Sequence, residues 1–371
     1  MHVPLLDLKE QNQALRPEIE AAIARVLDSN GFILGAEVAE LEKELAEYCQ
    51  TKFAIGCASG SDAILLALMA LDIGPGDEVI TTPYSFFATV SSITRLGATP
   101  VFVDIDPVTY NLDVSQIESK ITPHTKVIEP VHLYGQCADM AGLRAVSERH
   151  GIPLVEDAAQ AIGAEENGIR AGAMSAVGCF SFYPSKNLGG MGDGGFLTTN
   201  DDALAKKMSA LRVHGAEEKY YHKYVGLNSR LDGFQGAVLR TKLPHLDDWT
   251  NKRRANAAKY HQLFTDHGLT EQIGLPVERS NAKHIYNQFV IRVHHKRDEL
   301  RAFLTEKDIG TDIYYPVPLH LQECFAYLGY SDGDLPESER ASRETLALPI
   351  YPELRPEQQE YVVSTIAEFF N

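Results

Sequence analysis

The chain has 371 residues, enough for about two domains, and carries a formal net charge of −17. Hydrophobic residues make up 44% of it and charged residues 23%, which is ordinary for a globular protein. The negative charge argues against nucleic acid or an anionic membrane as a partner, because either surface would repel the protein.

The N-terminal segment MHVPLLDLKEQ lacks the apolar core of a signal sequence, and no run of about 18 apolar residues follows it. We therefore expect a cytoplasmic protein with no membrane segment. Residues 9–29 predict an amphipathic helix that ends at Asn30-Gly31, a common helix stop.

From about residue 52, short apolar strands alternate with helices. The predicted strands are 52–59, 77–83, 99–106, 125–135 and 152–159. The predicted helices between them are 61–73, 86–97, 114–121 and 140–151. This alternation is typical of a parallel sheet that helices cover on both faces.

The rest of the chain divides near residue 245. Before that point lie two paired strands (177–185 and 194–201), a helix (202–215), and a polar, aromatic, aperiodic segment at 215–235 that favours a functional role. After it the sequence predicts a long helix, a strand and two further helices, at 247–264, 285–293, 297–307 and 356–370. We predict a large α/β domain at 1–245 and a smaller α+β domain at 246–371.

Two residues carry the strongest chemical signal. Lys186 lies in FSFYPSKNLGGMGDGG, between a Ser/Pro turn and a run of glycines. Asp157 ends an apolar strand, at the edge where open α/β sheets bind ligands, and an acid there is costly without a partner. An amine that bonds to an aldehyde, with a carboxylate that keeps a pyridine nitrogen protonated, is what pyridoxal phosphate (PLP) requires. A helix cap is the alternative role for Asp157.

Other residues suit the same cofactor. Gly60 and Ser61 open a predicted helix, where free backbone amides bind phosphate, although the segment taken alone is more simply a helix cap. Ser181 offers a hydroxyl to the same phosphate, Phe86 a ring that could lie on the cofactor, and Gln160 an amide for its phenolic oxygen. A role in the core is the alternative for Phe86.

Several other sites are not predicted. The segment 190–195 matches GxGxxG, but a strand-like FLTTND follows it, so it offers no helix N-terminus to a dinucleotide. Neither the histidines nor the cysteines have metal-ligand spacing, and no CxxC pair suggests a disulfide framework. The cysteines are Cys49, Cys57, Cys137, Cys179 and Cys324.

Taken together, these segments resemble the DegT/DnrJ/EryC1/StrS family of PLP-dependent sugar aminotransferases. The likeness runs from the first helix to near residue 325. Its most specific pieces are CASGSDAI, TTPYSFFAT, PVHLYGQCADM, VEDAAQAIGA, SFYPSKNLGGMGDGG, VGLNSRLDGFQGAVL and YYPVPLHLQ. The resemblance implies the aspartate-aminotransferase fold (PLP fold type I) and a homodimer with shared active sites.

The resemblance also implies roles for individual residues. Lys186 corresponds to the Schiff-base lysine and Asp157 to the partner of the pyridine nitrogen. The other matching cofactor contacts are Gly60, Ser61, Phe86, Gln160, Ser181 and, reaching in from the partner subunit, Asn228. Ser59 departs from the family pattern, in which many members have Asn, but the backbone amides matter more there.

A lysine at position 186 favours transamination, since the related 3-dehydratases have histidine there. The leading hypothesis is transfer of the amino group of L-glutamate to C3 of a dTDP- or UDP-linked 3-keto sugar. The alternatives are C4 of a 4-keto-6-deoxy sugar, a keto-inositol, or a regulator without enzymatic activity. The predicted contacts to the nucleotide sugar are Lys219, Tyr221, His222, Arg230, Tyr315 and His320.

Overall fold

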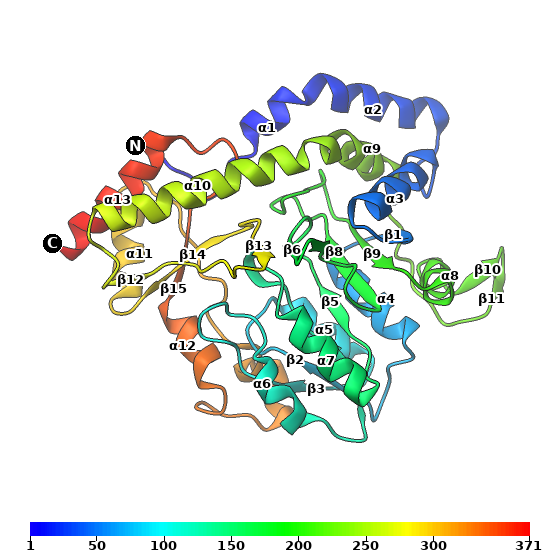
Figure 1. Cartoon of the computed structure of the whole chain (residues 1–371). Coiled ribbons are helices and arrows are strands. Elements are labelled where there is room, and N and C mark those ends of the chain that lie inside the picture. Colours follow the sequence, from blue (N-terminus) through cyan, green and yellow to red (C-terminus); the bar gives the residue numbers. More distant parts are fainter.

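The computed structural model describes all residues, 1–371, and is built around a sheet of mostly parallel strands (Figure 1). One part of the sheet has the order β1–β9–β8–β5 and the other the order β3–β2–β4. Parallel bridges from Ile128 to Leu154 and from Val131 to Asp157 join β4 to β5. Only β9 is antiparallel to its neighbours, so the predicted mostly parallel sheet is confirmed. The strands are β1 (Phe53–Cys57), β2 (Glu78–Thr81), β3 (Thr99–Phe102), β4 (Thr125–Glu129), β5 (Val155–Asp157), β8 (Val177–Ser181) and β9 (Gly195–Thr199).

Helices cover both faces of this sheet. Successive strand residues point to opposite faces: Val79 and Val127 join one hydrophobic core, and Ile80 and Ile128 join the other. The first core includes residues of α4 (Gly60–Ala70), α5 (Phe87–Arg95) and α8 (Asp202–Leu211). The second includes residues of α3 (Ala36–Tyr48), α7 (Met140–His150) and α9 (Gly233–Lys242).

The predicted N-terminal helix is two helices, α1 (Lys9–Ala14) and α2 (Arg16–Ser29), which meet at Leu15. Helix α2 ends where it was expected, at Asn30 in the left-handed conformation. In Figure 1 it lies across the top of the molecule, above α3 and α9, and Ala22 and Val26 pack on Ala237 of α9.

The C-terminal part has its own core. Helix α10 (Leu246–Asp266) begins next to the proposed boundary and packs with α11 (Arg297–Glu306), α13 (Pro356–Phe370) and a sheet in the order β12–β14–β15. Those strands are β12 (Ile273–Gly274), β14 (Phe289–Val293) and β15 (Thr345–Leu348). Val3 also lies in this core and bridges to Ile309, although it belongs to the predicted large domain. The division at residue 245 remains a prediction.

Shorter elements complete the fold. The aperiodic segment at 215–235 contains a small hairpin of β10 (Ala216–Glu218) and β11 (Tyr221–His222), which lies at the edge of the molecule in Figure 1. Helix α12 (Pro336–Glu344) packs against the large domain, where Asp104 accepts hydrogen bonds from the backbone amides of Glu337 and Ser338. The others are α6 (Val114–Ile117), β6 (Glu165–Glu166), β7 (Ile169–Arg170) and β13 (Ala282–Lys283).

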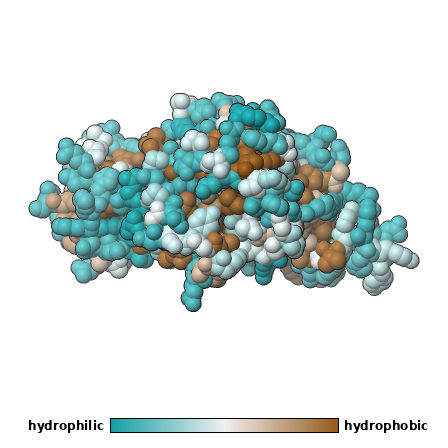
Figure 2. All heavy atoms as spheres, turned by 90° about the horizontal axis from the view of Figure 1, so that it is seen from below, coloured by the Kyte–Doolittle hydropathy of each residue, from teal (hydrophilic) through white to brown (hydrophobic).

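The surface of the protein is mostly polar. The face shown in Figure 2 is mostly hydrophilic, with separate apolar areas. None of the helices combines the length and the apolar character that crossing a membrane requires.

Candidate active site

A cavity of about 530 Å³ brings together most of the predicted cofactor residues. It lies at the carboxyl ends of β5 and β8, beside the N-terminus of α4. The predicted residues that line it are Gly60, Ser61, Phe86, Asp157, Gln160, Ser181, Lys186 and Tyr315. These residues come from segments spread over more than half of the chain, and the fold brings them together in one cavity.

Asp157 is buried at the end of β5 with its carboxylate facing the cavity. One oxygen accepts a hydrogen bond from Thr89 Oγ1 at 2.8 Å and the other from the backbone amide of Ala159 at 3.2 Å. Burial raises the pKa of Asp157, although these bonds and the charge of Lys186 oppose the rise. No helix follows β5, so the alternative role as a helix cap does not apply. A protonated ring nitrogen would supply the missing counter-charge.

Lys186 lies in the turn after β8, half-buried, and its backbone amide donates to the carbonyl of Tyr183 at 2.8 Å. Burial lowers the pKa of its amine to about 8, while the Asp157 carboxylate opposes that shift. A lowered pKa leaves more of the amine neutral near physiological pH, which a nucleophilic lysine requires.

The glycine run after Lys186 is held by helix α9, which the sequence did not indicate. Lys242 Nζ donates to the carbonyl of Gly189 at 2.9 Å, and Gln235 Oε1 accepts from the backbone amide of Met191 at 2.8 Å. A Cβ on Gly189 would lie 2.3 Å from the carbonyl oxygen of Pro184, so only glycine lets the loop fold back this tightly. Helix α9 therefore anchors the glycine loop that follows Lys186 at two points.

The N-terminus of α4 lies at the cavity, where the sequence predicts an anion site. Ser59 is its N-cap and accepts a hydrogen bond from the amide of Asp62 at 3.1 Å, which leaves the amides of Gly60 and Ser61 at the open end of the helix. A Cβ on Gly60 would lie 2.7 Å from Cβ of Ser181, so β8 and α4 meet here with room only for glycine. Ser59 therefore caps the helix. The backbone amides of Gly60 and Ser61 beside it remain free to bind an anion.

Phe86 and Gln160 complete the part of the site that would hold the cofactor. The Phe86 side chain is 56% exposed in this chain, and its ring centroid lies 6.2 Å from that of Tyr315. Gln160 is buried and hydrogen-bonds Tyr315. An amine, a buried carboxylate, an anion cradle and an open aromatic face share one cavity, so the residues fit PLP.

Other predicted residues lie outside this cavity. Lys219, Tyr221 and His222 are on or beside the exposed hairpin, and neither Asn228 nor Arg230 reaches the cavity of its own chain. His320 is fully buried, where its Nε2 lies 3.1 Å from Glu339 Oε1 and its ring packs near Phe102. The structure therefore gives His320 a packing position and offers no route for a sugar to its ring.

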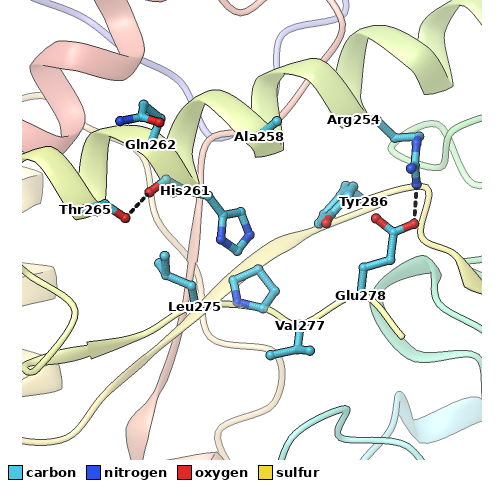
Figure 3. Close-up of a pocket in the computed structure, with 10 residues that line it drawn as sticks. Arg254, Ala258, His261, Gln262, Thr265, Leu275, Val277, Glu278 and Tyr286 are labelled. Carbon is cyan, nitrogen blue, oxygen red and sulfur yellow. Dashed lines mark hydrogen bonds and ion pairs between the residues drawn. The ribbon is translucent and has the colours of Figure 1, made fainter. Parts of the chain in front are cut away.

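A second cavity, of about 690 Å³, lies along α10 (Figure 3). It contains none of the predicted site residues and shares no lining residue with the first. Its arginine, Arg254, is already paired with Glu278 at 2.6 Å and donates to the carbonyl of His284. The first cavity is thus the candidate active site.

Comparisons with known proteins agree with this assignment. The model of the DegT/DnrJ/EryC1/StrS aminotransferase family matches residues 13–367. A pleiotropic regulatory protein of Geobacillus stearothermophilus is 54% identical over 370 residues, which cover 100% of this chain and 99% of that protein. The dTDP-3-amino-3,4,6-trideoxy-alpha-D-glucose transaminase of Streptomyces venezuelae is 47% identical, over 99% of this chain and 96% of its own. The crystal structure of DesV from S. venezuelae matches with a TM-score of 0.96 at 46% identity, covering 99% of this chain and 98% of that one.

Proposed function

Because the chain belongs to the DegT/DnrJ/EryC1/StrS aminotransferase family, we propose that it transfers the amino group of L-glutamate to C3 of a dTDP- or UDP-linked keto sugar. Membership of the family confirms the predicted PLP cofactor and enzyme class, and the structural match confirms PLP fold type I. One relative over the full length is named as a regulatory protein and another as a transaminase. The proposed cofactor residues that meet in the cavity, Lys186 and Asp157 among them, favour the transaminase.

The observation that carries the proposal is the meeting of Lys186, Asp157 and the α4 N-terminus in one cavity. PLP, when bound, supplies the electron sink that amino-group transfer requires. Asp157 keeps the ring nitrogen protonated, and the Lys186 amine, with its pKa lowered to about 8, takes up and returns a proton at the reacting carbon. The amides of Gly60 and Ser61 bind the phosphate and so fix the ring relative to both residues.

The test is to incubate the protein with L-glutamate and separate dTDP- and UDP-linked 3-keto sugars, 4-keto-6-deoxy sugars and a keto-inositol, and to detect the amino sugar by mass spectrometry. We expect product only with a 3-keto sugar. Product from a 4-keto sugar or the inositol would replace the C3 assignment, and no product from any of them would contradict the sugar substrate.

The charges in the cavity favour a homodimer with shared active sites. Among its lining residues are two carboxylates, Asp157 and Asp193, and a single cationic side chain, Lys186. In the proposed function the amine of Lys186 is used to hold the cofactor. A nucleotide diphosphate therefore finds no free cation in the cavity of its own chain. The exposed hairpin region carries cations, and its Tyr220 and Val225 are 81% and 92% exposed. We propose that this region of the partner subunit, with Asn228, completes the site.

Mixing two inactive variants tests the shared site. Lys186→Ala and Asn228→Ala should each be inactive, but a mixed dimer would contain one site with both changes and one with neither. At full subunit exchange we expect about a quarter of wild-type activity, because half of the dimers are mixed and each has one intact site. A monomer by light scattering, or no recovery after exchange has been demonstrated by differential tagging, would contradict the proposal.

Alanine variants of the proposed sugar contacts should separate the two half-reactions. Each loses a charged or hydroxyl hydrogen bond to the nucleotide sugar, so KM for that substrate should rise by about 10-fold or more. The half-reaction with glutamate, followed by the cofactor's absorbance, should remain nearly unchanged. The variants are Lys219→Ala, Tyr221→Ala, His222→Ala and Arg230→Ala; Tyr315 is left out because it also hydrogen-bonds Gln160 beside the cofactor.

The matched control for these variants is Lys252→Ala on α10, where the exposed lysine pairs only with Asp248 at 2.8 Å. It should change neither half-reaction. If a hairpin variant damages both half-reactions equally, its residue acts on folding or on the cofactor and its assignment to the sugar is lost. His320 is left out of the set, because truncating its buried ring would disturb the core.

A further inference from the structure

The Gln160 side chain is held in one orientation by two hydrogen bonds. Its Oε1 accepts from the backbone amide of Tyr134 at 2.7 Å, and its Nε2 lies 3.0 Å from the hydroxyl of Tyr315. Only the amide oxygen can face a backbone N–H, so the NH₂ group must be the end that points to Tyr315. One of its two N–H bonds is given to Tyr315, and the other remains for the cavity.

Tyr315 reaches this position from the C-terminal part of the chain. Its backbone amide donates to the hydroxyl of Tyr84 at 3.2 Å, and the hydroxyls of Tyr84 and Tyr134 both donate to the carbonyl of Tyr314. The ring of Tyr315 packs edge-on against Tyr84, with centroids 6.3 Å apart. Two buried tyrosines of the large domain thus fix the backbone of residues 314–315, and this in turn places the Tyr315 hydroxyl against Gln160.

The Tyr315 hydroxyl remains neutral in this setting. Burial raises its pKa, and the charge of Asp157 raises it further. A neutral hydroxyl accepts the N–H of Gln160 with a lone pair and still has its own proton to donate. Ionisation of the hydroxyl therefore does not break the bond to Gln160 near neutral pH.

We propose that Tyr315 is a positioning residue for the cofactor, which holds Gln160 so that its second N–H is directed at the phenolic oxygen of PLP. This inference rests on the part of the proposed function that places Gln160 at that oxygen. It is independent of the sugar substrate. Through Tyr315, a segment beyond residue 245 would control the charge on the cofactor.

The inference has a spectroscopic consequence. A hydrogen bond donated to the phenolic oxygen stabilises its anionic form, and the nitrogen through which Lys186 holds the cofactor shares a proton with that oxygen. With the donor in place, the nitrogen gives up its proton at lower pH. Without the hydrogen bond from Gln160, the anionic phenolic oxygen is less stable, and the nitrogen keeps its proton to higher pH.

The experiment is a pH titration of the visible absorbance band of the holoenzyme, without substrate. In Tyr315→Phe the midpoint should rise by about 0.5–1 unit, the equivalent of one lost hydrogen bond. In Gln160→Ala it should rise by at least as much. The double variant should show no more than Gln160→Ala alone, since Tyr315 acts only through Gln160.

Tyr314→Phe is the matched control, because the hydrogen bonds of the network use the carbonyl of Tyr314 and not its hydroxyl. Its midpoint should equal that of the wild type, and both Phe variants should melt within about 4 °C of the wild type, because at most one hydrogen bond is lost. An unchanged midpoint in Tyr315→Phe, or shifts that add in the double variant, would overturn the inference. A shift in an enzyme that aminates no sugar would remove the proposed substrate and leave the role of Tyr315 intact.

Discussion

Lys186→Ala is expected to abolish transamination while leaving the fold intact. The variant loses both the covalent attachment of the cofactor and the group that moves the proton, and general acid–base catalysis alone contributes about 10²–10⁴-fold to a rate. The Lys186 side chain forms no hydrogen bond with the rest of the protein, so its removal breaks no contact of that kind. The measurements are turnover with glutamate and keto sugar, and circular dichroism of the apo-protein.

The matched control is again Lys252→Ala, an exposed lysine that should keep full turnover. Borohydride treatment of the wild type should fix the cofactor to the peptide that contains Lys186, which mass spectrometry would identify. Activity of Lys186→Ala within tenfold of the wild type would remove this residue from the mechanism. The melting temperatures should be compared for apo-proteins, because bound cofactor adds its own stabilisation.

The sequence predicted the strands of the parallel sheet well because they leave local signals, and most of the proposed cofactor residues line one cavity. Apolar strands alternate with helices, and Asn30 marks a helix end that the structure confirms. Gly60 is required by its contact with Ser181, which no local pattern shows, yet a glycine at a helix start already suggests an anion site. Helix α3 left a signal that was missed, since Val38, Leu41 and Leu45 follow a helical period and are buried together.

Other features could not be read from the sequence because they depend on distant contacts. The faces that α12 buries include Ser338, Glu339 and Ser342, so it shows no apolar stripe, and its first amides are capped by Asp104 from another part of the chain. Gln160 and Tyr315 are separated by 155 positions, and their hydrogen bond exists only after the two parts of the chain pack together.

His320 and Lys242 also have structural roles that the sequence alone does not reveal. His320 lies in a motif typical of the family, but its burial against Phe102 and its contact with Glu339 follow from tertiary packing. Lys242 lies in no recognisable motif, and yet its buried ammonium group donates to the carbonyl of Gly189 in the loop after Lys186. Burial lowers the pKa of Lys242 to about 8, so its bond to that carbonyl is the main compensation for its charge.

Asp157→Asn is expected to bind PLP and to turn over about 10²–10³-fold more slowly than the wild type, the usual cost of removing one preorganised electrostatic group. The amide has the same shape, and its oxygen can still accept the hydrogen bond from Thr89. It has no negative charge, so the ring nitrogen loses its proton and the ring becomes a weaker electron acceptor. Because burial already raises the pKa of Asp157, the neutral amide should not destabilise the apo-protein.

Thr89→Val provides the graded comparison for Asp157→Asn, because it removes the hydrogen bond from Thr89 Oγ1 to Asp157, together with the one between Thr89 Oγ1 and Ser85 Oγ, and leaves the carboxylate in place. Without that bond the pKa of Asp157 rises further, since the hydroxyl of Thr89 favours the ionised form. The protonated ring nitrogen of the bound cofactor still opposes this rise in the pKa of Asp157. Turnover should therefore fall by much less than in Asp157→Asn. Measurements of kcat, PLP affinity and apo-protein melting temperature in both variants separate charge from packing. Equal losses in the two would show that the shape of the Asp157 contact matters more than its charge, and a near-normal rate in Asp157→Asn would end its role as partner of the ring nitrogen.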